Sequence, residues 1–443
     1  MFKYFEDFLK IPRNSGNEKM ISDYLVNFAI ENNLEYYQDE YYNVIIKRKS
    51  NNNSKKTIIL QGHIDMVCVS NRDFDFNSKG IRWYIGDNMY KAFDTSLGAD
   101  NGVGCSIILE ILSNKELLIP NIEAIFTTNE ETNMLGAKKL DYSKITGNCL
   151  ISIDGTEEGV IEVSSAGMTS ILLEDDINRS LSSGYVYEIS ISGLSGGHSG
   201  VDIDKNNLNS IKLMINLLDN IKNYKLISIS GGGAYNVIPS ECVCIILSDT
   251  EIDVHNLIKK HKKYIKINCK GLVKCAKVIS DSNFDKLIGF MHNLPIGVLS
   301  YNDSYPQTSI NLAAIKTGYK HLSIKVSIRS SNTLEENYYI DNIKKNSNMK
   351  FSIEDTIPFF NSDDNDYIRN LLIKEYELLY GKKCLLKHVH AGLEGGVFKE
   401  NIPNLSICVI APDIYDIHST KERVDISSVI RVYNWLINVL RKL

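Results

Sequence analysis

The sequence LQGHIDMV, from Leu60 to Val67, joins the end of an apolar run to a histidine and an aspartate two positions apart. Positions two apart in an extended backbone point to the same face, so His63 and Asp65 share one side of a predicted strand end. Open α/β sheets hold their sites at the carboxyl ends of strands. His63 is therefore a candidate metal ligand that Asp65 orients through the other ring nitrogen. A chance pairing of two polar residues is the alternative.

Around this stretch, the first third of the chain alternates strand and helix signals. Helical spacing of apolar side chains marks residues 18–31, and residues 103–112 predict a buried helix because almost every position is small or apolar. Short apolar or β-branched runs predict strands between these helices. Strands separated by helices imply a mostly parallel sheet with helices on both faces. The same character returns after residue 358. The predicted strands are 42–47, 57–60, 122–128, 150–153 and 405–409, and the later helices are 367–379 and 426–440.

The middle of the chain has the pattern of an antiparallel sheet. Residues 185–192 alternate apolar and polar side chains, as a half-exposed strand does. We therefore expect an α/β fold in which 1–179 and 358–443 form a catalytic domain and 180–357 form an inserted α+β domain. The other predicted elements of this insert are a helix at about 205–221, a basic amphipathic helix at 253–264, and strands at 225–230, 242–248, 310–316 and 322–328.

Composition and charge exclude several classes of protein. The 443 residues are 43% hydrophobic and 23% charged, which excludes a disordered or coiled-coil chain. Forty-nine basic against 54 acidic residues offer no electrostatic footprint for nucleic acid. No apolar run is long enough for a membrane span, and Glu6 and Asp7 interrupt any signal peptide. Nine cysteines without a Cys-x-x-Cys spacing indicate reduced thiols, so we expect a cytoplasmic protein.

Three further acidic motifs and a late histidine extend the pattern. Glycines flank Asp100 at the entrance of an apolar helix, where the carboxylate is either an N-cap or a metal ligand. Glu130 and Glu131 directly follow an apolar strand, as a general base beside a ligand or as an ordinary charged loop. Asp154 follows the next strand, and His418 lies in a polar loop. Together these donors suit a pair of divalent cations such as Zn²⁺, Mn²⁺ or Co²⁺.

These motifs, in this order, resemble the M20 family of co-catalytic metallopeptidases, and within it the aminoacyl-histidine dipeptidase branch. The similarity runs from the N-terminus to about Arg423. The strings that carry it are Gly62–Val67, Leu97–Gly104, Glu130-Glu131, Gly196–Gly200, Asn236–Pro239 and His390–Glu394.

The resemblance implies a centre with two divalent metal ions. Asp100 is expected to bridge both ions, His63 and Asp154 to complete one site, and Glu131 and His418 to complete the other. The implied metal is zinc, with manganese or cobalt as alternatives. The peptide bond that follows Asp100 is expected to be cis.

The resemblance also implies the catalytic residues. Asp65 orients His63, and Glu130 is the general base that takes a proton from metal-activated water and passes it to the leaving amine. His390 and Glu394 are expected to line the cleft without an assigned role. The implied substrate-binding residues are His198, Asn236, Arg329 and Gly395.

Three of these residues, His198, Asn236 and Arg329, lie in the inserted domain, which is expected to serve as a lid and dimerisation domain. His198 would hold the carbonyl oxyanion, often by reaching across a dimer into the partner's cleft, and Arg329 would bind the substrate carboxylate. The implied function is hydrolysis of short unblocked peptides, above all Xaa-His dipeptides, by a homodimer that binds neither nucleic acid nor membrane. The alternatives are a tripeptidase, an N-acyl amino acid amidohydrolase and a non-catalytic peptide-binding scaffold.

Overall fold

The computed structural model describes residues 1–254, 263–363 and 366–443, which form two compact units. The first unit comprises Met1–Ser165, Phe360–His388 and Glu394–Leu443. The second comprises Ala166–Phe359 and Val389–Leu393, so it contains the predicted insert 180–357. It also takes in residues 166–179, because β9 (Gly167–Asp176) pairs with β16 (His321–Ser330) and β17 (Lys350–Ile357).

The main sheet of the first unit is parallel at its centre and antiparallel at both edges. Strands β6, β3, β7 and β20 are parallel neighbours, whereas β1, β2, β8 and β18 pair in antiparallel fashion. The predicted α/β class is confirmed, with a mixed sheet in place of a mostly parallel one. In sheet order the strands are β1 (Glu35–Gln38), β2 (Val44–Arg48), β6 (Asn121–Thr127), β3 (Thr57–His63), β7 (Cys149–Ser152), β20 (Ser406–Val409), β8 (Val160–Ser165) and β18 (Phe360–Asn361), and β19 (Leu385–Val389) pairs with β8.

Helices cover both faces of this sheet. Side chains alternate along β3, so a Cβ at Gly62 would lie 2.5 Å from Asn101 Oδ1 of α3, whereas Gln61 donates to Glu394 of α10. Glycine at position 62 therefore permits the close approach of α3. The helices are α1 (Phe2–Lys10), α2 (Lys19–Glu31), α3 (Ala99–Ser113), α4 (Leu135–Lys139), α9 (Tyr367–Tyr380), α10 (Glu394–Asn401) and α11 (Ile426–Leu440), and a small sheet contains β4 (Trp83–Gly86), β5 (Met89–Ala92), β21 (Ile414–Tyr415) and β22 (Arg423–Asp425).

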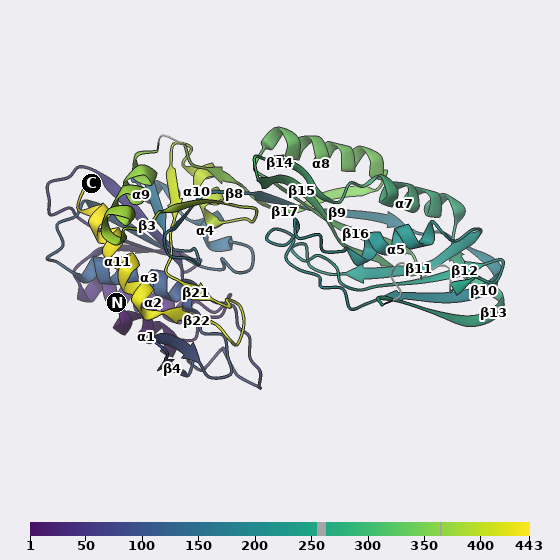
Figure 1. The fold of residues 1–443 in the computed structure, drawn as a ribbon, viewed down its shortest axis with the longest axis horizontal. Helices are drawn as coiled ribbons and strands as arrows, with labels where there is room; N and C mark the ends of the chain where they lie inside the picture. The colour runs from purple at the N-terminus through teal and green to yellow at the C-terminus, as the bar shows by residue number, and fades with distance from the viewer. Residues whose placement is uncertain (255–262, 364–365) are drawn as a thin grey trace. The chain divides into compact units, whose positions relative to one another are not determined.

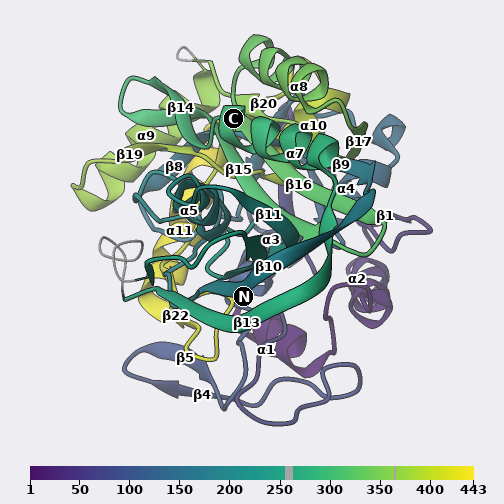
Figure 2. The same ribbon diagram turned by 90° about the vertical axis from the view of Figure 1, so that its right-hand side faces the viewer.

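The second unit is an antiparallel sheet with helices α5, α7 and α8 packed on it (Figures 1 and 2). The alternating segment 185–192 falls almost entirely in β10, where Tyr187, Ile189 and Ile191 are buried, and the α+β prediction is confirmed. Asn209 caps α5, which makes this helix shorter than predicted. Most of the helix predicted at 253–264 lies outside the described residues. The remaining elements are β10 (Arg179–Ile191), β11 (Tyr224–Gly232), β12 (Cys242–Ser248), β13 (Ile265–Ile279), β14 (Gly297–Asn302), β15 (Tyr305–Thr317), α5 (Ser210–Leu218), α7 (Asp281–Asn293) and α8 (Thr333–Ser347).

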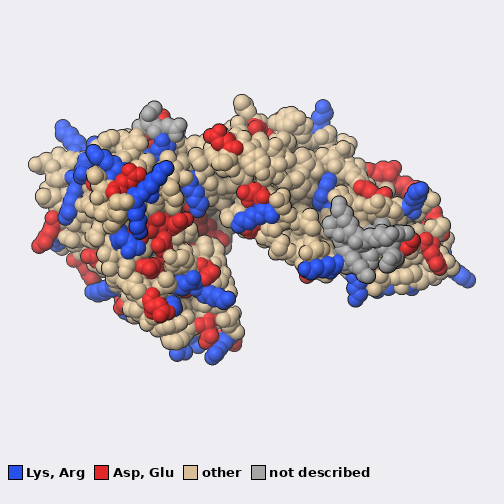
Figure 3. Space-filling model, viewed as in Figure 1, with Lys and Arg blue, Asp and Glu red and all other residues tan. Residues whose placement is uncertain are grey.

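The surface and the cysteines agree with the composition. Basic and acidic side chains are interspersed on the face shown in Figure 3. In the described part of the chain, none of the helices has the length and apolarity needed to cross a bilayer. The nine cysteines are all free thiols.

Candidate metal centre

Three neighbouring parallel strands bring the predicted residues together at their carboxyl ends. His63 ends β3, Glu130 and Glu131 follow β6, and Asp154 follows β7. Because β6, β3 and β7 are adjacent, their ends meet at one edge of the sheet. Asp100 reaches the same point from the start of α3, and the loop between β21 and β22 adds His418.

The carboxylate of Asp100 divides between two groups of donors. Its Oδ1 lies 3.1 Å from Nε2 of His63, which is itself 3.3 Å from Oδ1 of Asp154. Its Oδ2 lies 3.4 Å from Nε2 of His418, which is 3.0 Å from Oε1 of Glu131. The two groups are those expected to hold the two ions. Their function as ligands remains a prediction.

The donor set fits divalent cations in both spacing and charge. Zinc with bonds of about 2.0–2.1 Å places tetrahedral ligands roughly 3.3 Å apart, and ligand atoms of His63, Asp100 and Glu131 lie within 4.8 Å of one another. Burial raises the pKa of Asp154. Burial would lower the pKa of His418, but Asp100 and Glu131 raise it to about 10. The group thus attracts positive charge, as a site for metal ions should.

Asp65 ties the first two strand ends together. Its Oδ1 lies 3.4 Å from Nδ1 of His63 and accepts a hydrogen bond from the backbone N–H of Glu130, while Oδ2 accepts from Ser15 and from the N–H of Glu131. Burial opposes the charge of Asp65, but the interactions with His63 and Ser15 outweigh it and lower the pKa. Asp65 therefore fixes the position of the His63 ring relative to the backbone of Glu130 and Glu131.

Close packing around Asn101 positions the start of α3. Asn101 donates to the carbonyl of Ile153 and to Oδ1 of Asp154, both at 2.6 Å. A Cβ at Gly104 would lie 2.2 Å from Asn101 Oδ1, so glycine is required there. The backbone is non-helical at Asp100 and Asn101, and the bond between them is cis, as expected.

Two buried charged residues that the sequence analysis missed hold the backbone of the centre. Glu422 accepts hydrogen bonds from the four consecutive N–H groups of residues 97–100. Arg13 donates to the carbonyls of Ile64, Asp65 and Gly98. Both act on main-chain groups far away in the sequence, so no local motif marks them.

A second cluster of predicted residues forms within the second unit. The backbone N–H of Ser199 donates to the carbonyl of Asn236, and His198 forms an isolated antiparallel β-bridge with Val237. Ser199 Oγ accepts from Nε of Arg329 at 3.2 Å. The structure thus brings His198, Asn236 and Arg329 together. Gly395, the fourth predicted substrate contact, lies in the first unit, at the start of α10.

The Nδ1 atom of His198 accepts the backbone N–H groups of Gly200 and Val201, both at 3.2 Å. A neutral ring that accepts at Nδ1 carries its proton on Nε2. Nε2 of His198 is therefore a hydrogen-bond donor, which is the role expected at an oxyanion.

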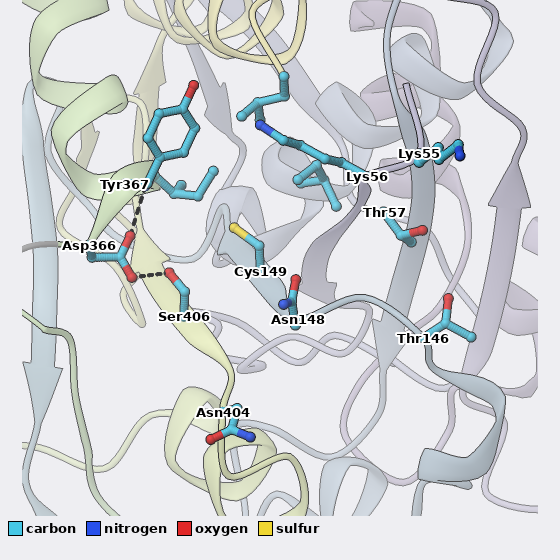
Figure 4. Close-up of a pocket in the computed structure, with 13 residues that line it drawn as sticks. Lys55, Lys56, Thr57, Thr146, Asn148, Cys149, Asp366, Tyr367, Asn404 and Ser406 are labelled. Carbon is cyan, nitrogen blue, oxygen red and sulfur yellow. Dashed lines mark hydrogen bonds between the residues drawn. The ribbon is translucent and has the colours of Figure 1, made fainter. Parts of the chain in front are cut away.

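A surface pocket lies at the opposite, amino-terminal edge of the first unit's sheet (Figure 4). Its polar groups contact one another, since Asp366 accepts a hydrogen bond from Ser406 and the Lys56 ammonium lies 4.7 Å from the centroid of the Tyr367 ring. None of the predicted site residues lines it. The pocket is therefore separate from the candidate metal centre.

Comparisons with known proteins agree with this geometry. Residues 43–178 match peptidase family M28. The cytosol non-specific dipeptidase of Escherichia coli is 28% identical over 471 aligned positions, which cover 100% of this chain and 97% of that protein. The structure of aminoacylhistidine dipeptidase from Vibrio alginolyticus superposes with a TM-score of 0.86 at 27% identity, covering 100% and 96%. A Staphylococcus aureus tripeptidase shares the fold, with a TM-score of 0.60, 15% identity and coverage of 100% and 97%. The predicted resemblance is confirmed.

Proposed function

From its full-length similarity to dipeptidases of the M28/M20 type, we propose that this chain is a metallo-dipeptidase. Its substrates are short unblocked peptides, with Xaa-His dipeptides preferred. One observation carries the proposal: the two oxygens of Asp100 divide between the pair His63 and Asp154 and the pair Glu131 and His418. This arrangement suits two cations that share one carboxylate.

The proposed cofactor is a pair of divalent ions, zinc first, with manganese or cobalt as alternatives. His63, Asp154, Asp100, Glu131 and His418 would hold them. When bound, such ions polarise a peptide carbonyl and make water acidic enough to attack it at neutral pH. Asp65 keeps Nε2 of His63 directed at this group by its contact with Nδ1.

Glu130 is the proposed general base. The structure gives its carboxylate no hydrogen bond to other described residues, and burial raises its pKa well above the ordinary value. A carboxylate that is free of structural partners and has a raised affinity for protons suits proton transfer. Glu130 takes a proton from the attacking water while the water oxygen bonds to the carbonyl carbon. It then delivers that proton to the amide nitrogen as the C–N bond breaks.

The second unit supplies the proposed substrate contacts. The Nε2–H of His198 donates to the carbonyl oxygen as it becomes negative, an interaction that strengthens in the transition state. The guanidinium of Arg329 pairs with the substrate carboxylate, and Asn236 adds a polar contact. The backbone of Gly395, in the first unit, is a further proposed contact. The second unit would thus act as a lid and dimerisation domain, in a cytoplasmic homodimer.

A substrate panel tests the proposal against its alternatives. Purified protein is incubated with Zn²⁺, Mn²⁺ or Co²⁺ and with Xaa-His dipeptides, other dipeptides, tripeptides and N-acetyl amino acids. We expect hydrolysis of the unblocked dipeptides, fastest for those ending in histidine. Hydrolysis confined to tripeptides or to N-acetyl amino acids would favour one of the other amidohydrolase activities. Binding without hydrolysis under all three metals would favour the scaffold.

A further inference from the structure

The second unit contains a buried cation that has no counter-ion among the described residues. The side chain of Arg329, on β16, is 3% exposed, and its Nε donates to Ser199. Burial lowers its pKa to about 10. Among the described residues, no carboxylate forms an ion pair with this guanidinium. A buried charge of this kind is costly unless an anion joins it.

His390 lies on the same face of the sheet as Arg329. Its Nε2 lies 2.7 Å from Oγ of Ser309, and Ser309 is the residue directly opposite Arg329 in the β15–β16 pairing. Directly opposed residues project from the same face. The imidazole and the guanidinium are therefore neighbours. In agreement, burial first and Arg329 second lower the pKa of His390 to about 4, against the opposite effect of the Pro306 carbonyl.

The ring of His390 is neutral, because burial and Arg329 both oppose a positive charge on it. The side chain is 9% exposed, and within the described part of the chain Nδ1 has no hydrogen bond that meets normal geometry. When Nε2 accepts from the Ser309 hydroxyl, the proton of the ring lies on Nδ1. Nδ1 then carries a buried N–H donor close to Arg329, which has no carboxylate partner among the described residues.

The segment that carries His390 is fitted closely to the Gly196–Gly200 turn. A Cβ at Gly200 would lie 2.4 Å from the carbonyl oxygen of His390 and 3.1 Å from the ring of His198. Glycine at position 200 therefore allows residues 389–393 to pack against the turn that bears His198 and Ser199. The packing fixes the distance between His390 and the residues around Arg329.

We propose that Nδ1 of His390 donates a second hydrogen bond to the carboxylate that Arg329 binds, and so selects substrates with a free C-terminus. The inference rests on the proposed function, since it takes the anion to be the C-terminal carboxylate of a peptide. A neutral imidazole adds a donor without adding a second positive charge. The site then offers one cation and one extra donor to one carboxylate, and an uncharged C-terminal amide is disfavoured.

Two substitutions distinguish the nitrogens of His390. The amide nitrogen of asparagine takes a place close to that of Nδ1, whereas that of glutamine takes a place close to Nε2. We expect His390→Asn to keep a KM near that of the wild type for an unblocked dipeptide. His390→Gln should raise KM about 10- to 100-fold with little change in kcat, since a hydrogen bond to a charged group is lost.

The same dipeptide with a C-terminal amide is the matched substrate. We expect the preference of the wild type for the free carboxylate over the amide to fall by the same factor in His390→Gln. The exposed His292, changed to asparagine, controls for loss of a histidine elsewhere in the second unit. Thermal melting of each variant shows that it is folded. A low KM in His390→Gln together with a high KM in His390→Asn would overturn the proposal, as would unchanged selectivity in both.

Binding separates this inference from the proposed function. The Glu130→Gln protein should bind the dipeptide more tightly than its amide, and adding His390→Gln should remove the difference. If the wild type hydrolyses nothing while this binding pattern holds, only the proposed function is wrong. If the wild type hydrolyses dipeptides while the binding difference survives His390→Gln, only the inference is wrong.

Discussion

At the scale of single residues, Glu130 differs from its neighbour Glu131 in what it contacts. Glu131 lies 3.0 Å from His418, whereas the carboxylate of Glu130 has no hydrogen bond to the described residues. We expect Glu130→Gln to lower kcat about 10²- to 10⁴-fold, the usual contribution of a general base, without changing metal content. Steady-state kinetics and metal analysis by mass spectrometry check this. Glu131→Gln should lose metal instead, and metal loss in Glu130→Gln would contradict the assignment.

Metal removal provides a second prediction at this scale, because the centre crowds carboxylates against one another. Asp100, Asp154 and Glu131 repel one another when no cation lies between them. We expect chelation to lower the melting temperature and added zinc to restore it. At a free zinc concentration of 100 times the dissociation constant, binding should raise the free energy of unfolding by about 2.7 kcal/mol. Differential scanning calorimetry with and without zinc measures this. Asp100→Asn should shrink the difference, and identical melting temperatures in the wild type would argue against bound metal.

At the scale of elements, Glu422 holds the non-helical start of α3 by four backbone N–H groups. Glutamine offers one acceptor oxygen and one NH₂ group, so some of these buried N–H groups would lose their partner. We expect Glu422→Gln to lower the free energy of unfolding by about 1–3 kcal/mol and to weaken metal binding through Asp100. Urea denaturation and metal titration measure the two effects. The exposed Glu40→Gln is the control, and equal stability of both variants would refute the role of Glu422.

The sequence predicted those parts of the centre that depend on local pattern. His63, Glu130 and Asp154 follow apolar strands, so their convergence could be foreseen from the geometry of a parallel sheet. Arg13 and Glu422 could not, because they bind main-chain carbonyl and N–H groups that any sequence provides. The pairing of partners distant in sequence depends on the completed fold.

The same distinction applies to the limits of elements and units. Helix α5 begins at Ser210, later than the predicted start at about residue 205. Asn209 is the N-cap: its backbone is extended and its side chain accepts the N–H groups of the first turn, so the helix cannot begin before it. Strand β9 joins the second unit through its pairing with β16, which its own sequence does not indicate. The alternation of apolar and polar side chains in β10, in contrast, could be recognised in the sequence itself, because one face of that strand is buried.

At the scale of the whole molecule, the proposed homodimer leads to a complementation experiment. We propose, as the sequence resemblance implies, that His198 reaches across the dimer into the partner's cleft. We therefore expect Glu130→Gln and His198→Ala each to be nearly inactive alone. In a heterodimer of the two, one site would combine an intact Glu130 with an intact His198 from the other chain. Random pairing should then restore about a quarter of wild-type activity.

Co-expression of the two variants with different affinity tags, followed by kinetics on the mixed and the separated species, measures this recovery. Light scattering reports whether the 50.0 kDa chain forms a species of twice that mass. The control is the homodimer of a double variant that carries both changes in one chain, and it should remain inactive. A stable heterodimer without recovery would show that His198 serves the metal centre of its own chain, because only that arrangement leaves both sites of the heterodimer incomplete.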